Sequence, residues 1–480
     1  MKRSFLLALC SSAALAQDVP LFTSDFPPEE FASRRAALYQ AIGESSAALV
    51  QGAAARDDYA RFRQSNELYY LSGVETPHAY LLLDGAKKKA TLFLPHRNEG
   101  RERSEGKLLS AEDAETVTKL AGVEAVMGTD LLGEQLARLA RGGGVRTLYT
   151  PYQPAEGVSM SRDLAIRGVA DHTADPWDGR PSREGQLLLN LRTRFPQLEL
   201  KDLSPALDAL RLIKSPRELA LIRRATRLAC LAILEAMRST EPGIYEHELD
   251  GVSKFVFARN GAQGEAYFSL IASGENVLFG HYNAGKRQLR DGELLLFDHA
   301  PDVGYYMSDV TRMWPVNGRW SATQREIYGF YVACYRAILK AIRPGVTSAV
   351  VMQEAAREMQ AALSRWRFGD PVYEKAAREF VETYAKKAEE KDARLGHWVG
   401  MATHDVGEAS GPLRAGMVFT IEPELRVKDA KVAIRLEDLV IVTENGREVA
   451  SDWLAWDMDA IAKVMREEGI LQRYPRDKEK

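Results

Sequence analysis

One structural pattern is written twice in the second half of this sequence, and the duplication constrains the fold more than any other feature. A capped helix is expected from Ser215 to the Pro-Gly pair at 242–243, and a second helix over 245–259. The same order, helix, Pro-Gly pair and helix, returns from Ser321 and ends with a helix over 348–363. Unrelated helical packing does not predict such a repeat, whereas two related halves of one domain do.

Each repeated unit is followed by two carboxylates on strand-like segments. An apolar run at 294–297 leads to one acidic residue, and a run at 417–421 leads to its counterpart. In both halves another acidic residue lies eight positions before an Asn-Gly pair. Buried carboxylates are strongly disfavoured unless paired, hydrogen-bonded or metal-bound, and four that converge would repel one another without cations between them. The four are Asp298 and Asp309 in the first half, and Glu422 and Glu437 in the second.

Four of the eight histidines lie near these strands, which indicates that imidazole belongs to the same site. His397 and His404 share one short glycine-containing segment before Glu422. One imidazole with four carboxylates suits a pair of Mn²⁺ ions, with Co²⁺, Zn²⁺ or Fe²⁺ as alternatives. Two such ions about 3.5–4 Å apart would share a water, lower its pKa and direct the resulting hydroxide at a polarised carbonyl. These residues therefore predict hydrolysis at a dinuclear metal site.

Charge and hydropathy exclude two kinds of partner. The 480 residues carry a formal charge of −3, so no net basic field is available to hold nucleic acid. Beyond the first residues, no apolar stretch approaches the ~18 residues that span a bilayer. The first residues have the layout of a signal peptide: Lys2 and Arg3 precede an apolar run at 5–10, and an A-x-A cleavage site follows at 14–16. We therefore expect residues 1–16 to be removed and the protein to be exported, to the periplasm or beyond.

The mature chain is expected to form two domains of the α/β (α+β) class. Helical and strand-like patterns alternate over 17–210, whereas 211–480 holds the duplicated helices. A charged tract at 374–394 predicts a solvated helix, and Cys230 and Cys334 are expected to be buried free thiols. Within the first domain we expect a helix over 31–42, strands over 47–51, 80–83 and 90–94, and a loop over 176–185.

The order and spacing of the candidate ligands resemble a known family. The pattern consists of two aspartates eleven residues apart, two histidines seven residues apart and two later glutamates. It resembles the pattern of the "pita-bread" dinuclear metallopeptidases. This family includes methionine aminopeptidase, prolidase, aminopeptidase P and the metal-free creatinase. The segment from Arg435 to Asp438 resembles the R-x-E-D segment of the proline-directed branch. Residues 59–77, with F-R-Q-S at 62–65, look like the creatinase/aminopeptidase P amino-terminal domain. The resemblance covers nearly the whole mature chain and implies a creatinase-type α/β domain followed by a pseudo-twofold pita-bread catalytic domain.

The resemblance also implies a role for each site residue. Glu422 would carry a proton from the bridging water to the leaving nitrogen, and Arg435 would hydrogen-bond a ligand carboxylate. His281 and His404 would face the substrate and help to position it. The implied metal ligands are Asp298, Asp309, His397, Glu422 and Glu437.

Three departures from the family pattern lie near the expected pocket. Ala393 stands where the family commonly has the first histidine of H-G-x-x-H, so one pocket histidine is missing. Glu424 and Arg426 stand where E-P-G-L-Y has Gly and an aromatic residue, and His299 replaces a small residue beside the first aspartate. None of these changes removes a ligand, but all of them bear on the pocket that receives proline.

The sequence therefore predicts a metallo-aminopeptidase that hydrolyses N-terminal X-Pro bonds in short peptides. Prolidase-like cleavage of X-Pro dipeptides is the near alternative, because both activities use the same ligands. A non-catalytic pita-bread binding protein is a further alternative, and the intact ligand set argues against it. Analogy with the family adds a homo-oligomer as an open expectation.

Overall fold

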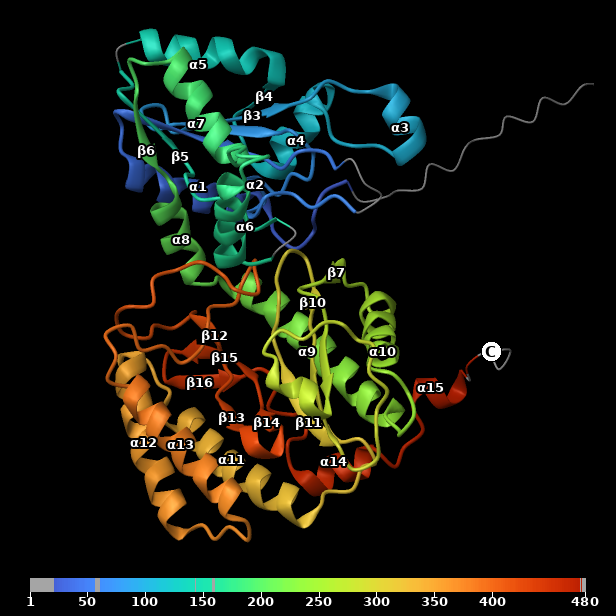
Figure 1. The fold of residues 1–480 in the computed structure, drawn as a ribbon. Coiled ribbons are helices and arrows are strands. Elements are labelled where there is room, and N and C mark those ends of the chain that lie inside the picture. Colours follow the sequence, from blue (N-terminus) through green and yellow to red (C-terminus); the bar gives the residue numbers. More distant parts are fainter. Residues whose placement is uncertain (1–20, 57–60, 143, 158–159, 475, 477–480) are drawn as a thin grey trace, which may run out of the picture.

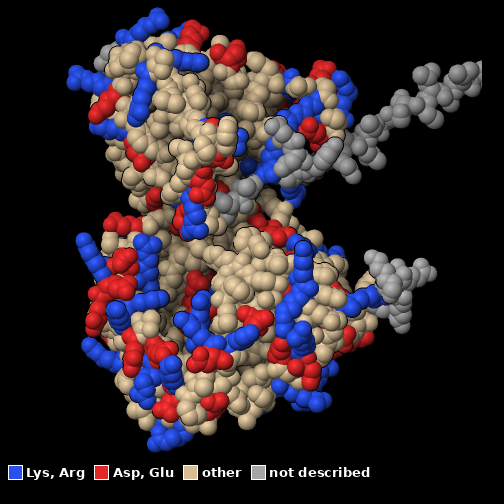
Figure 2. All heavy atoms as spheres, in the orientation of Figure 1, with Lys and Arg blue, Asp and Glu red and all other residues tan. Residues whose placement is uncertain are grey.

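The computed structural model describes residues 21–56, 61–142, 144–157, 160–474 and 476. Two lobes are stacked end to end, with the amino-terminal lobe above the lobe that holds the predicted ligands in Figure 1; because catalysis is expected there, we call the second one the catalytic lobe. The predicted signal peptide at 1–16 lies outside the described residues. Within them, no helix is long and apolar enough to cross a membrane. Figure 2 shows acidic and basic side chains interspersed over the visible face, without a block of one sign.

The amino-terminal lobe is built on one mixed six-stranded sheet in the order β4-β3-β2-β1-β5-β6. Its central strand β1 pairs antiparallel with β2 and parallel with β5. The strands are β1 (Ser46–Gln51), β2 (Tyr80–Asp84), β3 (Lys89–Leu94), β4 (Ala125–Gly128), β5 (Thr147–Thr150) and β6 (Glu199–Asp202). The helices are α1 (Pro28–Ile42), α2 (Asn66–Ser72), α3 (Glu99–Glu105), α4 (Ala114–Ala121), α5 (Leu132–Arg141), α6 (Arg162–Ala174), α7 (Arg183–Arg194) and α8 (Ser204–Leu212).

Both faces of this sheet are buried, which explains why β1 is apolar from Ala47 to Val50. Side chains alternate between the two faces of a strand. Ala47 and Leu49 therefore join one core with Leu136 of α5 and Leu191 of α7, whereas neighbouring positions such as Ala48 join the main core with α1 and α4. The predicted helix and three strands of this lobe are confirmed.

The catalytic lobe contains the predicted duplication. One half carries the sheet β11-β9-β8 and the other the sheet β12-β15-β16. Its helices are α9 (Pro216–Ser239), α10 (Glu246–Arg259), α11 (Ala322–Ala341), α12 (Ser348–Arg365), α13 (Pro371–Lys387), α14 (Met458–Val464) and α15 (Ile470–Arg473). Its strands are β7 (Gly264–Glu265), β8 (Leu270–Ser273), β9 (Leu294–Asp298), β10 (Pro301–Asp302), β11 (Thr311–Pro315), β12 (Val418–Ile421), β13 (Glu424–Val427), β14 (Val432–Arg435), β15 (Asp438–Thr443) and β16 (Gly446–Val449).

The same capping chemistry starts the first helix of each half. Ser215 accepts from the Glu218 amide and forms a capping box with it, and Ser321 does the same with Gln324. The two sheets meet where Thr311 and Glu437 exchange backbone hydrogen bonds of 3.3 and 3.1 Å. That junction brings the carboxylates of both halves to one place.

Two expectations about helices are wrong in part. The loop expected over 176–185 ends earlier, because Ser182 caps α7 and accepts from the Gly185 amide. The charged tract at 374–394 is helical only as far as Lys387, and one face of α13 is buried through residues such as Phe380 and Val381. Interspersed charges concealed an amphipathic helix that packs on the catalytic lobe.

Buried ion pairs join the two lobes. Arg211, at the end of α8, is 1% exposed and contacts Asp405 of the catalytic lobe at 2.6 Å. It also lies 3.1 Å from Glu156 and 3.3 Å from Glu67 of the amino-terminal lobe. The domain boundary expected at residue 210 falls inside α8, and this network holds that helix against both lobes.

Candidate metal centre

The structure brings the five predicted ligands together at the junction of the two sheets. Asp298 ends β9 opposite Thr311, and Asp309 lies two residues before β11. Glu422 follows β12 and Glu437 precedes β15, so the second half repeats the arrangement. The imidazole Nε2 of His397 lies 3.5 Å from Asp309 and 3.3 Å from Glu422. Ligand atoms of Asp309, His397 and Glu437 all lie within 4.8 Å of one another.

The carboxylates are buried in a way that requires positive charge. Burial, together with Asp298 and Glu422, raises the pKa of Asp309 well above its ordinary value. Burial and neighbouring carboxylates likewise raise the pKa of Glu437. Burial lowers the pKa of the Arg435 guanidinium, but the carboxylates, Asp298 first, outweigh that effect and raise it. A single guanidinium does not balance four carboxylates.

One buried oxygen points to where the missing charge belongs. Glu437 is 1% exposed, and its Oε1 has no hydrogen-bond partner among the described residues. Its Oε2 accepts a hydrogen bond of 2.7 Å from Thr311 Oγ1. An unsatisfied buried carboxylate oxygen is costly unless a cation binds it. The donor set of carboxylate oxygens and one imidazole fits divalent ions, and no side chain occupies that role at Oε1.

Tyr267 is a site residue that the sequence analysis missed. Its hydroxyl is within hydrogen-bond distance of Asp298 Oδ1 at 2.5 Å and of Asp309 Oδ1 at 2.6 Å. Burial and these carboxylates raise the pKa of the phenol well above 10, so the oxygen keeps its proton. Such partners hold ligand carboxylates in place. No local pattern marks the residue, because its role depends on a contact between separate segments.

The predicted pocket residues differ in how closely they join the cluster. The His404 ring stacks on His397 with 3.9 Å between centroids, and burial followed by the His397 charge lowers the pKa of His404 to about 4. Its Nδ1 lies 3.4 Å from Asp163 of α6, an amino-terminal residue that the sequence analysis also missed. Arg435 pairs with Asp298. His281 is exposed on a loop after β8 whose neighbours Gly280 and Tyr282 line a small cavity with Arg435.

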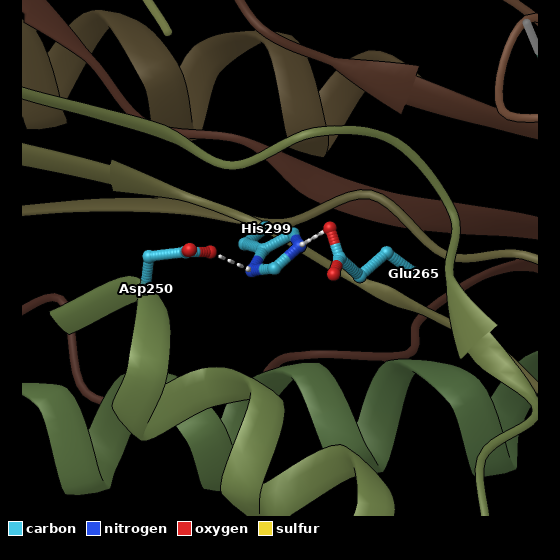
Figure 3. A group of neighbouring side chains, drawn as sticks. All are labelled: Asp250, Glu265 and His299. Atoms are coloured by element: carbon cyan, nitrogen blue, oxygen red, sulfur yellow. Dashed lines mark ion pairs between the residues drawn. The ribbon is translucent and has the colours of Figure 1, made fainter. Parts of the chain in front are cut away.

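His299 belongs to a separate ion network behind the centre. Figure 3 shows its fully buried ring between Asp250 and Glu265, which face opposite ring nitrogens at 3.9 and 3.5 Å. Lys254 contacts both carboxylates, at 2.8 and 3.1 Å, and so already supplies a cation there. We therefore assign no metal to this group. The residue that replaces a small side chain in the family pattern serves packing and charge balance on the far side of Asp298.

Comparison with known proteins decides the family. The model for metallopeptidase family M24 matches residues 220–444, and the model for the aminopeptidase P N-terminal domain matches 31–149. The Xaa-Pro aminopeptidase of Escherichia coli (strain K12) is 30% identical over 446 residues, which cover 88% of this chain and 95% of that protein. The chain belongs to the aminopeptidase P family of M24 metallopeptidases. The Xaa-Pro aminopeptidase of Haemophilus influenzae is 28% identical and covers 92% of this chain and 99% of its own length.

Solved structures agree with this family assignment. Aminopeptidase P from E. coli with the inhibitor Pro-Leu superposes with a TM-score of 0.73 at 27% identity, covering 94% of this chain and all of that one. A putative aminopeptidase P from Bacillus anthracis has a TM-score of 0.77 at 22% identity and supports the fold. The predicted family, the two-domain fold and a metal-dependent aminopeptidase activity are confirmed. The individual site residues remain assignments from this chain's own geometry.

Proposed function

We propose that this enzyme removes the N-terminal residue from short peptides with proline in second position, using two Mn²⁺ ions. The observation that carries the proposal is the five-ligand cluster at the junction of the sheets, with Glu437 Oε1 buried and unpartnered. The substrate class follows from relatives, named Xaa-Pro aminopeptidases, that match nearly the full length of this chain. When bound, the ions supply Lewis-acid polarisation of the scissile carbonyl and a nucleophilic water at neutral pH.

Glu422 is the carboxylate best placed to move a proton. Its side chain is 28% exposed, whereas those of Asp298 and Asp309 are 4% and 7% exposed. Thr420 Oγ1 donates to its Oε1 at 3.2 Å, which orients the group. An exposed carboxylate at the edge of the cluster can take a proton from the attacking water and pass it to the leaving nitrogen.

His404 and Arg435 position other groups at the site and do not transfer protons. With a pKa of about 4, the His404 ring is neutral at neutral pH and acts on the substrate through hydrogen bonds instead of charge. Arg435 pairs with Asp298 and places a positive charge beside that carboxylate. His281 is exposed on a loop whose neighbouring residues line a small cavity with Arg435, so its proposed role in positioning the substrate follows from the family resemblance.

A peptide panel with controlled metal tests this function. Metal-depleted protein is assayed on Ala-Pro-Ala and Ala-Pro before and after addition of Mn²⁺, Co²⁺ or Zn²⁺, and we expect Mn²⁺ to restore cleavage of the tripeptide best. Asp309→Ala and Glu437→Ala should abolish turnover while the circular dichroism spectrum persists, and Asp429→Ala, at an exposed turn, should remain active. Activity confined to the dipeptide would support the prolidase alternative, and full activity after exhaustive chelation would refute the mechanism.

We further propose that the protein is exported after removal of residues 1–16 and that it assembles as a homo-oligomer. The charged, apolar and small-residue layout of the first residues supports export. Cell fractionation with N-terminal sequencing of the mature protein tests the cleavage site, and light scattering tests assembly. An intact N-terminus in the cytoplasm would contradict the first proposal, and a monomer mass would contradict the second.

A further inference from the structure

A cavity between the two lobes opens directly on the metal centre. It has a volume of about 350 Å³, and both His397 and His404 line it. Its lining includes Asp163 and Ile166 of α6, from the amino-terminal lobe, and Arg394 and Trp398 from the catalytic lobe. Two backbone hydrogen bonds join the start of α6 to the segment that carries His404: the Arg162 amide donates to the His404 carbonyl (3.3 Å), and the Thr403 amide donates to the Met160 carbonyl (2.8 Å).

The cavity lies on the side from which the leaving peptide departs. Glu422, the proposed proton donor to the leaving nitrogen, is 3.3 Å from Nε2 of His397, which lines the cavity, so a nitrogen that Glu422 protonates lies beside the cavity wall. Proline and the residues after it are thus directed past His397 and His404 into the cavity.

Most charged groups on the cavity wall already have partners. Arg162 contacts Glu156 at 2.9 Å and Asp208 at 3.7 Å, and Asp405 is held by Arg211 and Lys214. Asp163 accepts from Ser161 and faces His404.

Arg394 is the exception on this wall. It is exposed, and it has no ion pair or hydrogen bond with other residues in the described part of the chain. It also lies beside Ala393, where the family pattern has a histidine. The wall therefore carries an unpaired, permanently charged guanidinium directly beside the position of that histidine.

We propose that Arg394 binds the C-terminal carboxylate of a bound tripeptide. The enzyme then prefers substrates with two residues after the scissile bond. This inference rests on the proposed function and adds the length and end-group preference. Two residues extend about 7 Å from the scissile carbonyl, and Arg394 is three residues from the ligand His397, a span of at most about 11 Å. A guanidinium recognises a carboxylate through two parallel hydrogen bonds, which Lys cannot reproduce.

Matched substrates isolate the end group. We compare Ala-Pro-Ala with its C-terminal amide, because the two differ only in the terminal charge. For the unmodified Mn²⁺-loaded enzyme we expect a three- to tenfold lower KM for the free acid, with similar kcat. Arg394→Ala should remove that difference by raising KM for the acid, Arg394→Lys should restore part of it, and Lys391→Ala, in the same exposed loop, should leave it unchanged.

The outcomes separate this inference from the function on which it rests. Cleavage of acid and amide with equal KM by the unmodified enzyme refutes the carboxylate site and leaves the proposed function intact. Persistence of the acid preference in Arg394→Ala places the recognition elsewhere and also overturns the inference. If neither peptide is cleaved after metal addition, the proposed function itself fails.

Discussion

Replacing Glu437 with Gln should stabilise the metal-free protein and at the same time remove its stabilisation by metal. Ligand atoms of Glu437 and Asp309 lie within 4.8 Å, and two unit charges at that separation repel by about 3.5 kcal/mol at an effective dielectric constant of 20. Both groups escape part of this cost by holding protons, as their raised pKa values indicate. The Gln carbonyl can still accept from Thr311 Oγ1. We therefore expect a net gain of about 1–2 kcal/mol at neutral pH, or roughly 1–2 °C in Tm for a chain of 480 residues.

Thermal unfolding in EDTA and in Mn²⁺ measures both effects. At a metal concentration of about 100 times Kd, the unmodified protein should gain about 2.7 kcal/mol, whereas the variant should gain almost nothing because it lacks a ligand. Glu444→Gln, at an exposed turn, is the matched control and should resemble the unmodified protein in both conditions. A lower Tm for Glu437→Gln in EDTA would refute the repulsion argument, and an unchanged metal response would show that Glu437 is not a ligand.

The same variant has a pH signature in EDTA. Because the pKa of Glu437 in the folded protein lies above its ordinary 4.5, the folded form holds more protons than the unfolded form in that interval. The metal-free protein therefore loses stability as pH rises through the raised pKa. The Tm advantage of the variant should widen between about pH 5 and about pH 8, and a constant difference would contradict this reasoning.

Three further predictions concern groups outside the ligand set. Tyr267→Phe removes the hydroxyl shared by two ligand carboxylates and should weaken Mn²⁺ binding by about 10- to 100-fold in a calorimetric titration, whereas unchanged affinity would exclude a role in holding them. Burial raises the pKa of Cys230 and Cys334 to about 12. A Cys10→Ser variant should therefore show no thiol that reacts with DTNB until denaturant exposes these two cysteines, and rapid labelling of the native protein would contradict their buried placement. Burial beside a second carboxylate raises the pKa of Glu67 to about 7, so the stability of the protein should decline as pH rises from about 4.5 to about 7. The Glu67→Gln variant should show a flatter slope of Tm against pH over this range, and an unchanged slope would refute the raised pKa.

Much of the catalytic lobe could be predicted because its signals are local. Ser215 and Ser321 cap helices through contacts three residues away, and apolar runs end in carboxylates at fixed spacing. The duplicated order of these signals was sufficient to place four carboxylates in one site. The length of α13 and its buried face were missed, because charges on its exposed side masked the apolar positions that pack on the lobe.

Residues that act through distant contacts could not be predicted in the same way. Tyr267 lies 42 positions from Asp309, and Asp163 reaches His404 from the other lobe. Neither has a spacing or motif that distinguishes it from ordinary tyrosines and aspartates. The unpaired state of Arg394 likewise became visible only when the other charges on the cavity wall were seen to have partners.

The sequence by itself determined the repeated helix unit and the class of chemistry and predicted the ligand set, since caps, periodicity and residue type act over a few neighbouring positions. Only the tertiary structure decided which polar groups share the buried space around that ligand set. It did so because the cost of an unpaired buried charge depends on every group within a few ångströms, whatever its place in the chain. Among the described residues, no neighbouring group binds Glu437 Oε1. His299, in contrast, is enclosed by carboxylates that Lys254 already balances.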